Sequence, residues 1–209
     1  RLHRVYRRAL RYLLAFILPA VVGLALTAYD LMPLLFGPEF APAALALVIL
    51  VWGQALDSLN PLLSQTLRAT DREWSVAKVT GVGALFNFAA NLILIPRYGL
   101  YGAAIATVAS FALVLTINQI ILRRAIGPAH IVGPLCRTLA AVGVMAAVLA
   151  ALAWTVLAAW SPLARFAAMV AVGAMVYPPA AFLFGVLDAE DRSFLVALIK
   201  SRRTKRRAS

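Results

Sequence analysis

The sequence predicts an all-α membrane protein, a polytopic transmembrane bundle of six helices. Of its 209 residues, 63% are hydrophobic and 13% are charged, and the mean hydropathy is +0.88, whereas soluble domains are about half apolar and a quarter charged. Six apolar runs each approach or exceed the ~20 residues that a helix needs to cross the hydrocarbon core. Because backbone polar groups in lipid must be hydrogen-bonded within the segment, each run is predicted to be helical.

The six runs follow one another with short polar connections. They are residues 12–29, 40–67 (interrupted by Asp57), 79–96, 98–122, 138–164 and 166–187. We divide the chain accordingly into a basic cytoplasmic or interfacial segment (1–12), helices one to four (13–125), two peripheral helices (126–188) and a basic cytoplasmic tail (189–209). The chain begins with Arg1 and not with Met, which favours a fragment of a longer protein.

Basic residues are sorted to one side of the predicted bundle. All but two of the 20 Lys and Arg residues lie in the N-terminal segment, the second and fourth connections, or the tail; the exceptions are Arg97 and Arg165. Since positively charged loops stay in the cytoplasm, both termini of this segment are predicted to be cytoplasmic. The net charge of +12 then indicates topology and contact with anionic membrane lipids. A nucleic-acid-binding protein would need a folded basic surface with base-contacting side chains, and the sequence indicates none.

Polar residues recur at helical spacing on the second, third and fourth runs. Steps of three and four place them on one face of each helix. We therefore expect these three helices to surround a polar interior, with the fifth and sixth at the rim. The candidate residues for a polar pathway or an ion-coupling site are Gln54, Asp57, Ser64, Arg68, Asn87 and Asn91.

Asp57 lies near the middle of its helix, where an ionised carboxylate is costly and faces a partner, an ion or water. Two interpretations remain open. Asp57 could bind a coupling ion or proton or line a substrate path, or it could be structural, held by Asn60, Asn87 or Asn91 or placed near the cytoplasmic interface. The asparagines of the third helix are interpreted as interhelical hydrogen-bonding groups.

A tight hairpin is predicted between the third and fourth helices. Pro96 discourages helical geometry at the residue before it and is expected to end the third helix. Gly99 permits the positive φ of a sharp reversal. Small residues then recur every four positions at Gly102, Ala106 and Ser110, which allows a neighbouring helix to approach closely.

Three segments resemble the bacterial polysaccharide flippases, the O-antigen and exopolysaccharide exporters. The run NLILIPRYGLYGAAIATVAS (91–110) resembles their hairpin. LMPLLFGP (31–38), with Ala43 and Ala44, is similar to an outer loop of that family, and LSQTLRATDREWSVAKV (63–79) to an inner loop. The motifs keep the family's order and spacing across about residues 10–125, and residues 126–209 match only in hydropathy.

The resemblance implies the C-terminal portion of a transporter of about twelve to fourteen helices in the bacterial cytoplasmic (inner) membrane. It implies alternating-access export of an isoprenoid-diphosphate-linked oligosaccharide during polysaccharide biosynthesis. The implied partners are that lipid-linked oligosaccharide and other polysaccharide-assembly membrane proteins. Flipping makes and breaks no bond, so no catalytic residue and no cofactor are expected. One Cys and two His, far apart, offer no metal-ligand spacing.

Other functions stay open from the sequence alone. A multidrug exporter or a lipid II type exporter of the same superfamily would share the composition. A membrane-embedded enzyme needs acidic pairs or His–Asp motifs on a sizeable loop, and the short connections leave no room for a catalytic domain. A non-transporting membrane scaffold would not need polar faces on three successive helices.

Overall fold

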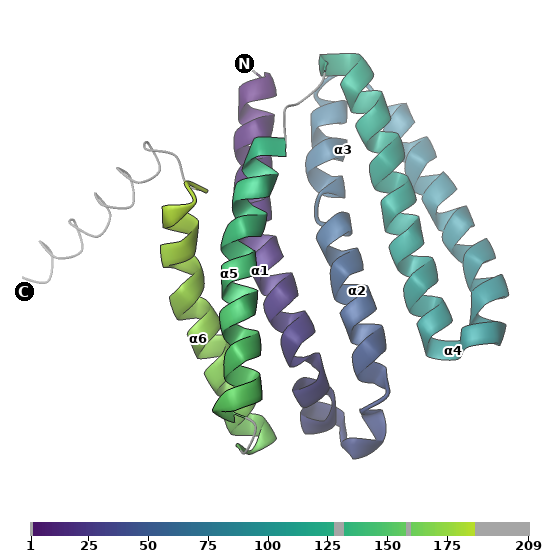
Figure 1. Cartoon of the computed structure of the whole chain (residues 1–209). Helices are drawn as coiled ribbons and strands as arrows, with labels where there is room; N and C mark the ends of the chain where they lie inside the picture. The colour runs from purple at the N-terminus through teal and green to yellow at the C-terminus, as the bar shows by residue number, and fades with distance from the viewer. Residues whose placement is uncertain (1, 128–131, 158–159, 187–209) are drawn as a thin grey trace, which may run out of the picture.

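The computed structural model describes residues 2–127, 132–157 and 160–186, and in these ranges all regular structure is helical (Figure 1). Helices α1, α5 and α6 pack together on one side, and the α4 hairpin lies on the other, with α2 and α3 between them (Figure 1). The elements are α1 (Leu2–Phe36), the short 3-10 helix η1 (Pro38–Phe40), α2 (Ala43–Asp57), α3 (Asn60–Arg68), α4 (Glu73–Ile126), α5 (Val132–Thr155) and α6 (Pro162–Leu183).

Five helical stretches in the described residues are long and apolar enough to cross a membrane, with α2 and α3 together forming one of them. The predicted count was six. The difference comes from α4, whose 54 residues would extend about 80 Å if straight. Gly99 within it has φ 55° and ψ −128°, and the chain reverses there (Figure 1). Helix α4 is therefore a hairpin with a first arm (73–98) and a second arm (100–126).

The two arms of α4 run antiparallel and in close contact. A Cβ built on Gly102 would lie 2.2 Å from the carbonyl oxygen of Leu94, and one built on Gly83 would lie 2.3 Å from a methyl group of Val114. The arms thus approach closely both next to the reversal and about four turns away from it. The reversal occurs where the sequence predicted it, but Pro96 does not end the first arm, which continues to the glycine.

Helix α1 is continuous from Leu2 through the basic N-terminal segment, without a break near residue 12. Tyr6, Leu10, Leu14 and Leu18 recur every four residues and are 2–7% exposed. Because that spacing keeps them on one face, they pack together into the main apolar cluster, which also contains Leu63, Leu67, Val76, Leu122, Val142, Met145, Leu149, Leu157 and Met169.

The fifth and sixth helices begin and end at other residues than predicted. The uncharged run was expected to continue to residue 164, but α5 ends at Thr155 and α6 begins at Pro162. Arg165 therefore lies in the first turn of α6, where its Nε is 3.2 Å from Oδ2 of Asp30 on α1. Arg165 was predicted to lie in the loop between the fifth and sixth helices, but it forms an ion pair between α6 and α1.

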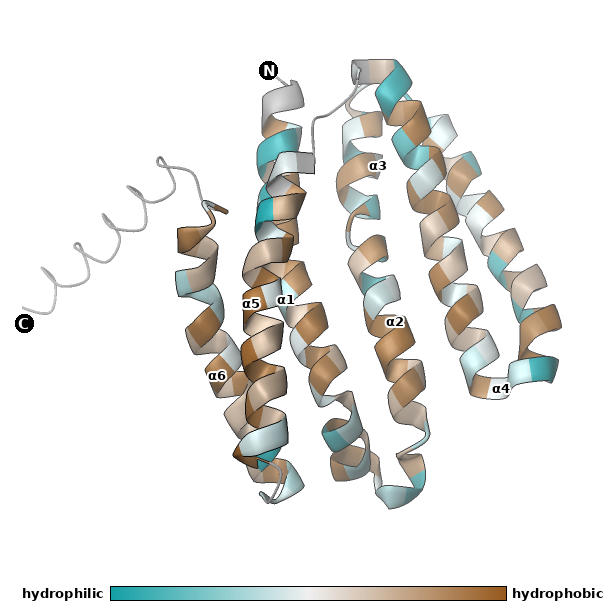
Figure 2. Ribbon diagram, viewed as in Figure 1, coloured by the Kyte–Doolittle hydropathy of each residue, from teal (hydrophilic) through white to brown (hydrophobic). Residues whose placement is uncertain are grey.

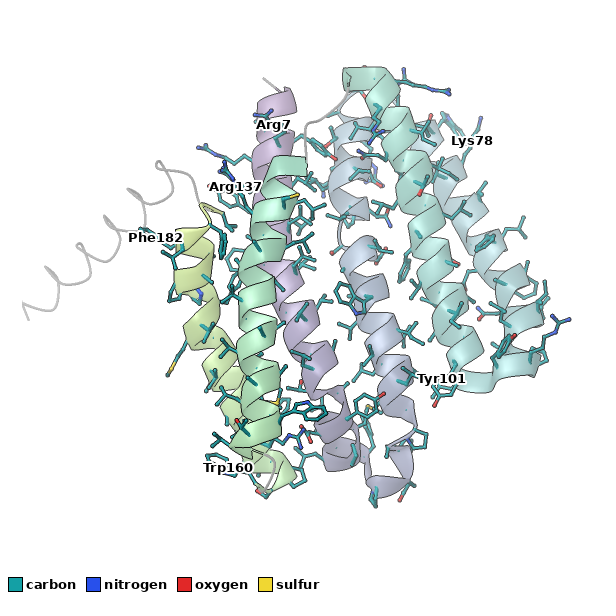
Figure 3. The ribbon with its side chains drawn as sticks, in the orientation of Figure 1. Arg7, Lys78, Tyr101, Arg137, Trp160 and Phe182 are labelled. Carbon is teal, nitrogen blue, oxygen red and sulfur yellow. The ribbon has the colours of Figure 1, made fainter. Side chains whose placement is uncertain are left out.

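The start of α1 and the end of α6 lie at the same end of the bundle (Figure 1). Arg7, Lys78 and Arg137 lie toward this basic end, whereas Tyr101 and Trp160 lie toward the opposite one (Figure 3). Hydrophilic residues gather toward the helix ends, and most of the helix surface between them is apolar (Figure 2). The predicted basic tail (189–209) lies outside the described residues.

Candidate functional site

A polar cavity of about 640 Å³ lies between α2–α3 and the two arms of α4. No residue of α1, α5 or α6 lines it, in agreement with the prediction that helices two to four surround a polar interior. Its polar lining is Asp57, Asn60, Ser64, Gln65, Arg68, Thr80, Asn87, Thr107 and Ser110.

One wall of the cavity is formed where the second predicted helix breaks. Helix α2 ends at Asp57 and α3 begins at Asn60, with Ser58 and Leu59 in a turn between them. Pro61 explains the break, because it has no N–H to donate to the carbonyl of Asp57 four residues earlier. The sequence predicted one helical run over residues 40–67, so this break was not predicted.

Asp57 is half-buried at this break. Its Oδ1 accepts a hydrogen bond of 3.3 Å from Nδ2 of Asn60, one of the neighbours that the structural interpretation named. Within the described part of the chain no Lys or Arg lies within ion-pair distance of the Asp57 carboxylate. Oδ1 of Asn60 is buried without a hydrogen-bond partner. Both residues therefore have oxygen atoms with unused acceptor capacity at this break.

The opposite wall carries a relay of hydrogen bonds across the α4 hairpin. Nδ2 of Asn91 donates to Oδ1 of Asn87 at 3.0 Å, and Nδ2 of Asn87 donates to Oγ of Ser110 at 3.1 Å. Ser110 in turn donates to the carbonyl of Ala106 at 2.7 Å. The predicted interhelical role of Asn87 is therefore confirmed. Asn91 acts one turn away and binds its own helix.

Two threonines present oxygen atoms to the same cavity. The hydroxyl of Thr80 donates to the carbonyl of Val76 at 3.0 Å, and that of Thr107 donates to the carbonyl of Ala103 at 2.9 Å. Because each hydrogen is used by the carbonyl one turn back, each hydroxyl faces the cavity as an acceptor. With Asp57 and Asn60, these groups place several acceptor oxygens at the cavity, alongside the donors of Gln65 and Arg68.

Four of the six predicted residues line the cavity together: Asp57, Ser64, Arg68 and Asn87. Gln54 is exposed on α2 outside the lining, and Asn91 reaches the cavity only through Asn87. Arg68 is exposed and lies at the end of α3, so the cavity has a cationic group toward the basic end. No cluster of His, Cys, Asp and Glu that could hold a metal ion occurs in the described ranges.

The apolar part of the lining was not predicted. It includes Val76, Gly83, Ala84, Phe111 and Val114. The same residue types occur at lipid-facing positions, so the sequence does not distinguish the two. Gly83 provided one signal, since it allows the arms to approach closely at Val114.

Comparisons with known proteins agree with this architecture. The "Probable low-salt glycan biosynthesis flippase Agl15" of Haloferax volcanii is 33% identical over 96 residues, which are 46% of this chain and 20% of Agl15. An uncharacterized membrane protein of Methanocaldococcus jannaschii is 33% identical over 97 residues, 46% of this chain and 19% of that protein. The matched part of the chain thus covers only about a fifth of the length of these relatives.

A solved structure has the same fold. The lipid II flippase MurJ in its inward closed conformation superimposes with a TM-score of 0.73 at 17% sequence identity, over 88% of this chain and 39% of that chain. The sequence pattern of the family described as "Lipid II flippase MurJ" matches residues 1–171. Because this match covers most of the 209 residues, the chain belongs to the MurJ lipid II flippase family of multi-pass membrane proteins.

Proposed function

We propose that this chain forms the C-terminal helices of a flippase that moves an isoprenoid-diphosphate-linked oligosaccharide from the cytoplasmic to the outer leaflet of a bacterial inner membrane. The observation that carries the proposal is the polar cavity between α2–α3 and α4, within helices whose outer faces are apolar (Figure 2). Agl15, one third identical over its matched segment, is named as a glycan biosynthesis flippase.

The physics of flipping requires such a cavity. A diphosphate and a glycan are charged or strongly hydrogen-bonding, and their burial in hydrocarbon without partners is costly. A cleft lined by amides, hydroxyls and an arginine replaces part of their hydration while the lipid tail stays in the membrane. Hydroxyl and carboxamide oxygens suit sugar hydroxyl groups, and the Arg68 guanidinium suits a phosphate oxygen.

In this proposal transport proceeds by alternating access, in which the polar cavity faces each side of the membrane in turn. The proposed polar pathway passes Asp57, Ser64, Arg68 and Asn87 in the cavity, with Gln54 and Asn91 beyond its lining, and Asp57 is the ion- or proton-coupling candidate. This role for Asp57 is supported by its carboxylate having a single hydrogen-bond partner among the described residues, Asn60. Both ends of this segment are proposed to be cytoplasmic, and other polysaccharide-assembly membrane proteins are proposed as partners.

A second candidate substrate is lipid II. The specific observation in its favour is the family match over residues 1–171, together with the fold shared with the lipid II flippase structure. The cavity chemistry suits both substrates, because each carries a diphosphate and sugars on an isoprenoid tail. They differ in the peptide of lipid II.

The test is transport by the full-length protein that carries this sequence, reconstituted into liposomes. Fluorescent isoprenoid-diphosphate oligosaccharide and fluorescent lipid II are supplied separately, and a membrane-impermeant quencher reports the outward-facing fraction over time. We expect faster flipping of the oligosaccharide than in protein-free liposomes. Faster flipping of lipid II alone would favour the second candidate. Equal rates with and without protein for both substrates would refute both.

A further inference from the structure

A second cavity, of about 390 Å³, lies toward the basic end of the bundle between α1, α3, the second arm of α4 and the start of α5. This volume is within the range of about 300–1,000 Å³ typical of ligand pockets. Leu10, Leu14 and Leu63 form a buried apolar floor, and Leu115 adds a partly buried wall. Thr116 and Arg123 are exposed along its α4 edge. The cavity is therefore an apolar slot with a polar, basic rim.

Tyr6 contributes a polar group to this slot whose hydrogen-bonding capacity is unused. The residue is 2% exposed and lines the cavity. Its hydroxyl is buried and has no hydrogen-bond partner among the described residues. Buried hydroxyl groups in proteins almost always have a partner, and leaving one without a partner is costly. The hydroxyl can donate to an acceptor that enters the cavity.

Arg123 supplies the charge that such an acceptor would meet. It lines the same cavity as Tyr6. The lining contains no Asp or Glu. Arg7 and Arg137 lie outside the lining but at the same end of the bundle (Figure 3), so they add positive charge to that end. A hydroxyl donor beside a guanidinium is a suitable pair for a phosphate oxygen.

We propose that this cavity binds an anionic phospholipid of the leaflet at the basic end. The phosphate accepts hydrogen bonds from the Tyr6 hydroxyl and the Arg123 guanidinium, and one acyl chain lies along the leucine floor. Basic pockets between transmembrane helices on the cytoplasmic side suit anionic headgroups. This site is separate from the polar cavity between α3 and α4, and its test does not depend on what the protein transports.

The first measurement is native mass spectrometry of the full-length protein. Phosphatidylglycerol or phosphatidylethanolamine is added to the protein in detergent, and the lipid that stays bound after the detergent is removed is measured. We expect phosphatidylglycerol to be retained preferentially. Arg123→Gln should lower its affinity by about fivefold, and Tyr6→Phe by about tenfold. The matched control is Arg124→Gln, which removes the same charge from the next residue of α4, outside the cavity lining, and should change retention little.

The second measurement is thermal unfolding with and without phosphatidylglycerol. Without the lipid, Tyr6→Phe should raise the Tm, because it removes a buried hydroxyl that has no partner. With the lipid, the same variant should gain less Tm than the wild type. This opposite response separates a lost ligand contact from simple damage to packing.

Three results would overturn the proposal. Equal retention of the two lipids would mean that the cavity does not select an anionic headgroup. An equal loss of retention in Arg123→Gln and Arg124→Gln would mean general attraction of headgroups to the basic end. Unchanged lipid retention in both Tyr6→Phe and Arg123→Gln would mean that another part of the protein fills the slot.

Discussion

Single polar side chains inside a membrane bundle connect helices as well as line cavities. The Asn91–Asn87–Ser110 relay does both, since it joins the two arms of α4 and places amide groups at the polar cavity. Hydrogen bonds between membrane helices contribute modestly, about 0.6 kcal/mol on average and up to about 1.7 kcal/mol. The relay therefore fixes the orientation of these groups more than it stabilises the fold.

A double-mutant cycle should reveal this interaction. Asn87→Ala and Ser110→Ala each remove one partner, and their combination should be less destabilising than the sum, with a coupling of about 0.6–1.7 kcal/mol. The free energy of unfolding in detergent measures it. As a control, Asn87→Ala combined with Thr116→Ala should be additive, because Thr116 bonds only to Ala112 of its own helix. Additivity of the first pair would contradict the relay.

Asp57 is the residue on which ion coupling depends in the proposed function. Asp57→Asn keeps the size of the side chain but removes its charge, so we expect a change in unfolding free energy below about 1 kcal/mol. If a cation or proton binds there, transport should fall by at least about fivefold, the lower end of typical coupling between two sites. The liposome assay, with and without an ion gradient, measures this effect.

The matched control is Asp71→Asn, which also removes one carboxylate. Asp71 has φ 58°, a region that Asn adopts readily, and it is exposed outside the cavity. Its transport should equal that of the wild type. Full transport by Asp57→Asn would leave Asp57 the structural role that the sequence also allowed.

At the scale of residues, periodicity predicted which polar side chains share a face. Asp57, Ser64, Arg68 and Asn87 do meet at one cavity. Periodicity did not determine how far along the face the cavity extends, so Gln54 lies beyond it. It also could not show whether a charged residue marks a loop or an ion pair, and Arg165 was for that reason wrongly assigned to a loop.

At the scale of elements, the α4 hairpin depends on two glycines for different reasons. Gly99 has a positive φ, and a Cβ at this position would meet open space, so its requirement is conformational. Gly102 is helical, but any Cβ would collide with the Leu94 carbonyl. The first glycine permits the reversal, and the second permits the close approach of the arms after it.

Alanine substitutions should separate these two requirements. Gly99→Ala should cost about 1–3 kcal/mol of backbone strain. Gly102→Ala should cost more, because the backbone of the first arm would have to move. Gly81→Ala is the control, since its Cβ meets open space, and it should stabilise the helix by up to about 1 kcal/mol. Thermal unfolding of the three variants gives the order, and equal Tm values for Gly102→Ala and Gly81→Ala would refute the close approach.

The elements themselves were predictable from hydropathy, but their ends were not. The sequence did not predict that α1 extends through the basic segment and past Asp30 to Phe36, because charged residues were taken as the helix boundaries. Tyr6 and Leu10 show why it fails as a boundary: they bury one face of a helix whose other positions carry arginines. Burial by neighbouring helices is a tertiary effect that a single run of residues does not contain.

At the scale of the whole molecule, charge sorting and helix direction agree. Arg7, Lys78 and Arg137 lie at one end (Figure 3), as the positive-inside rule predicts for a cytoplasmic face. The rule predicts that this end lies in the cytoplasm, and exposed residues at the two ends of the bundle allow this orientation to be tested.

Thiol labelling in intact cells should report the orientation. Cys136 is exposed and directly precedes Arg137, which lies toward the basic end (Figure 3). A membrane-impermeant maleimide should not label Cys136 until the cells are permeabilised. Arg97→Cys in a Cys136→Ser background should be labelled without permeabilisation, since Arg97 is exposed near the hairpin corner. Labelling of Cys136 from outside intact cells would invert the topology and contradict a cytoplasmic basic end.

The interruption between α2 and α3 has a mechanical consequence. Hinges are a few residues at the ends of elements that absorb large torsional changes, and Ser58 and Leu59 are placed in this way. The start of α2 is held to the α4 hairpin, because the Tyr101 hydroxyl donates to the Pro42 carbonyl at 2.8 Å. A tilt of α3 at this hinge would widen the cavity mouth beside Arg68 while α2 and the hairpin corner stay closed. Such a motion would open one side of the membrane without opening the other.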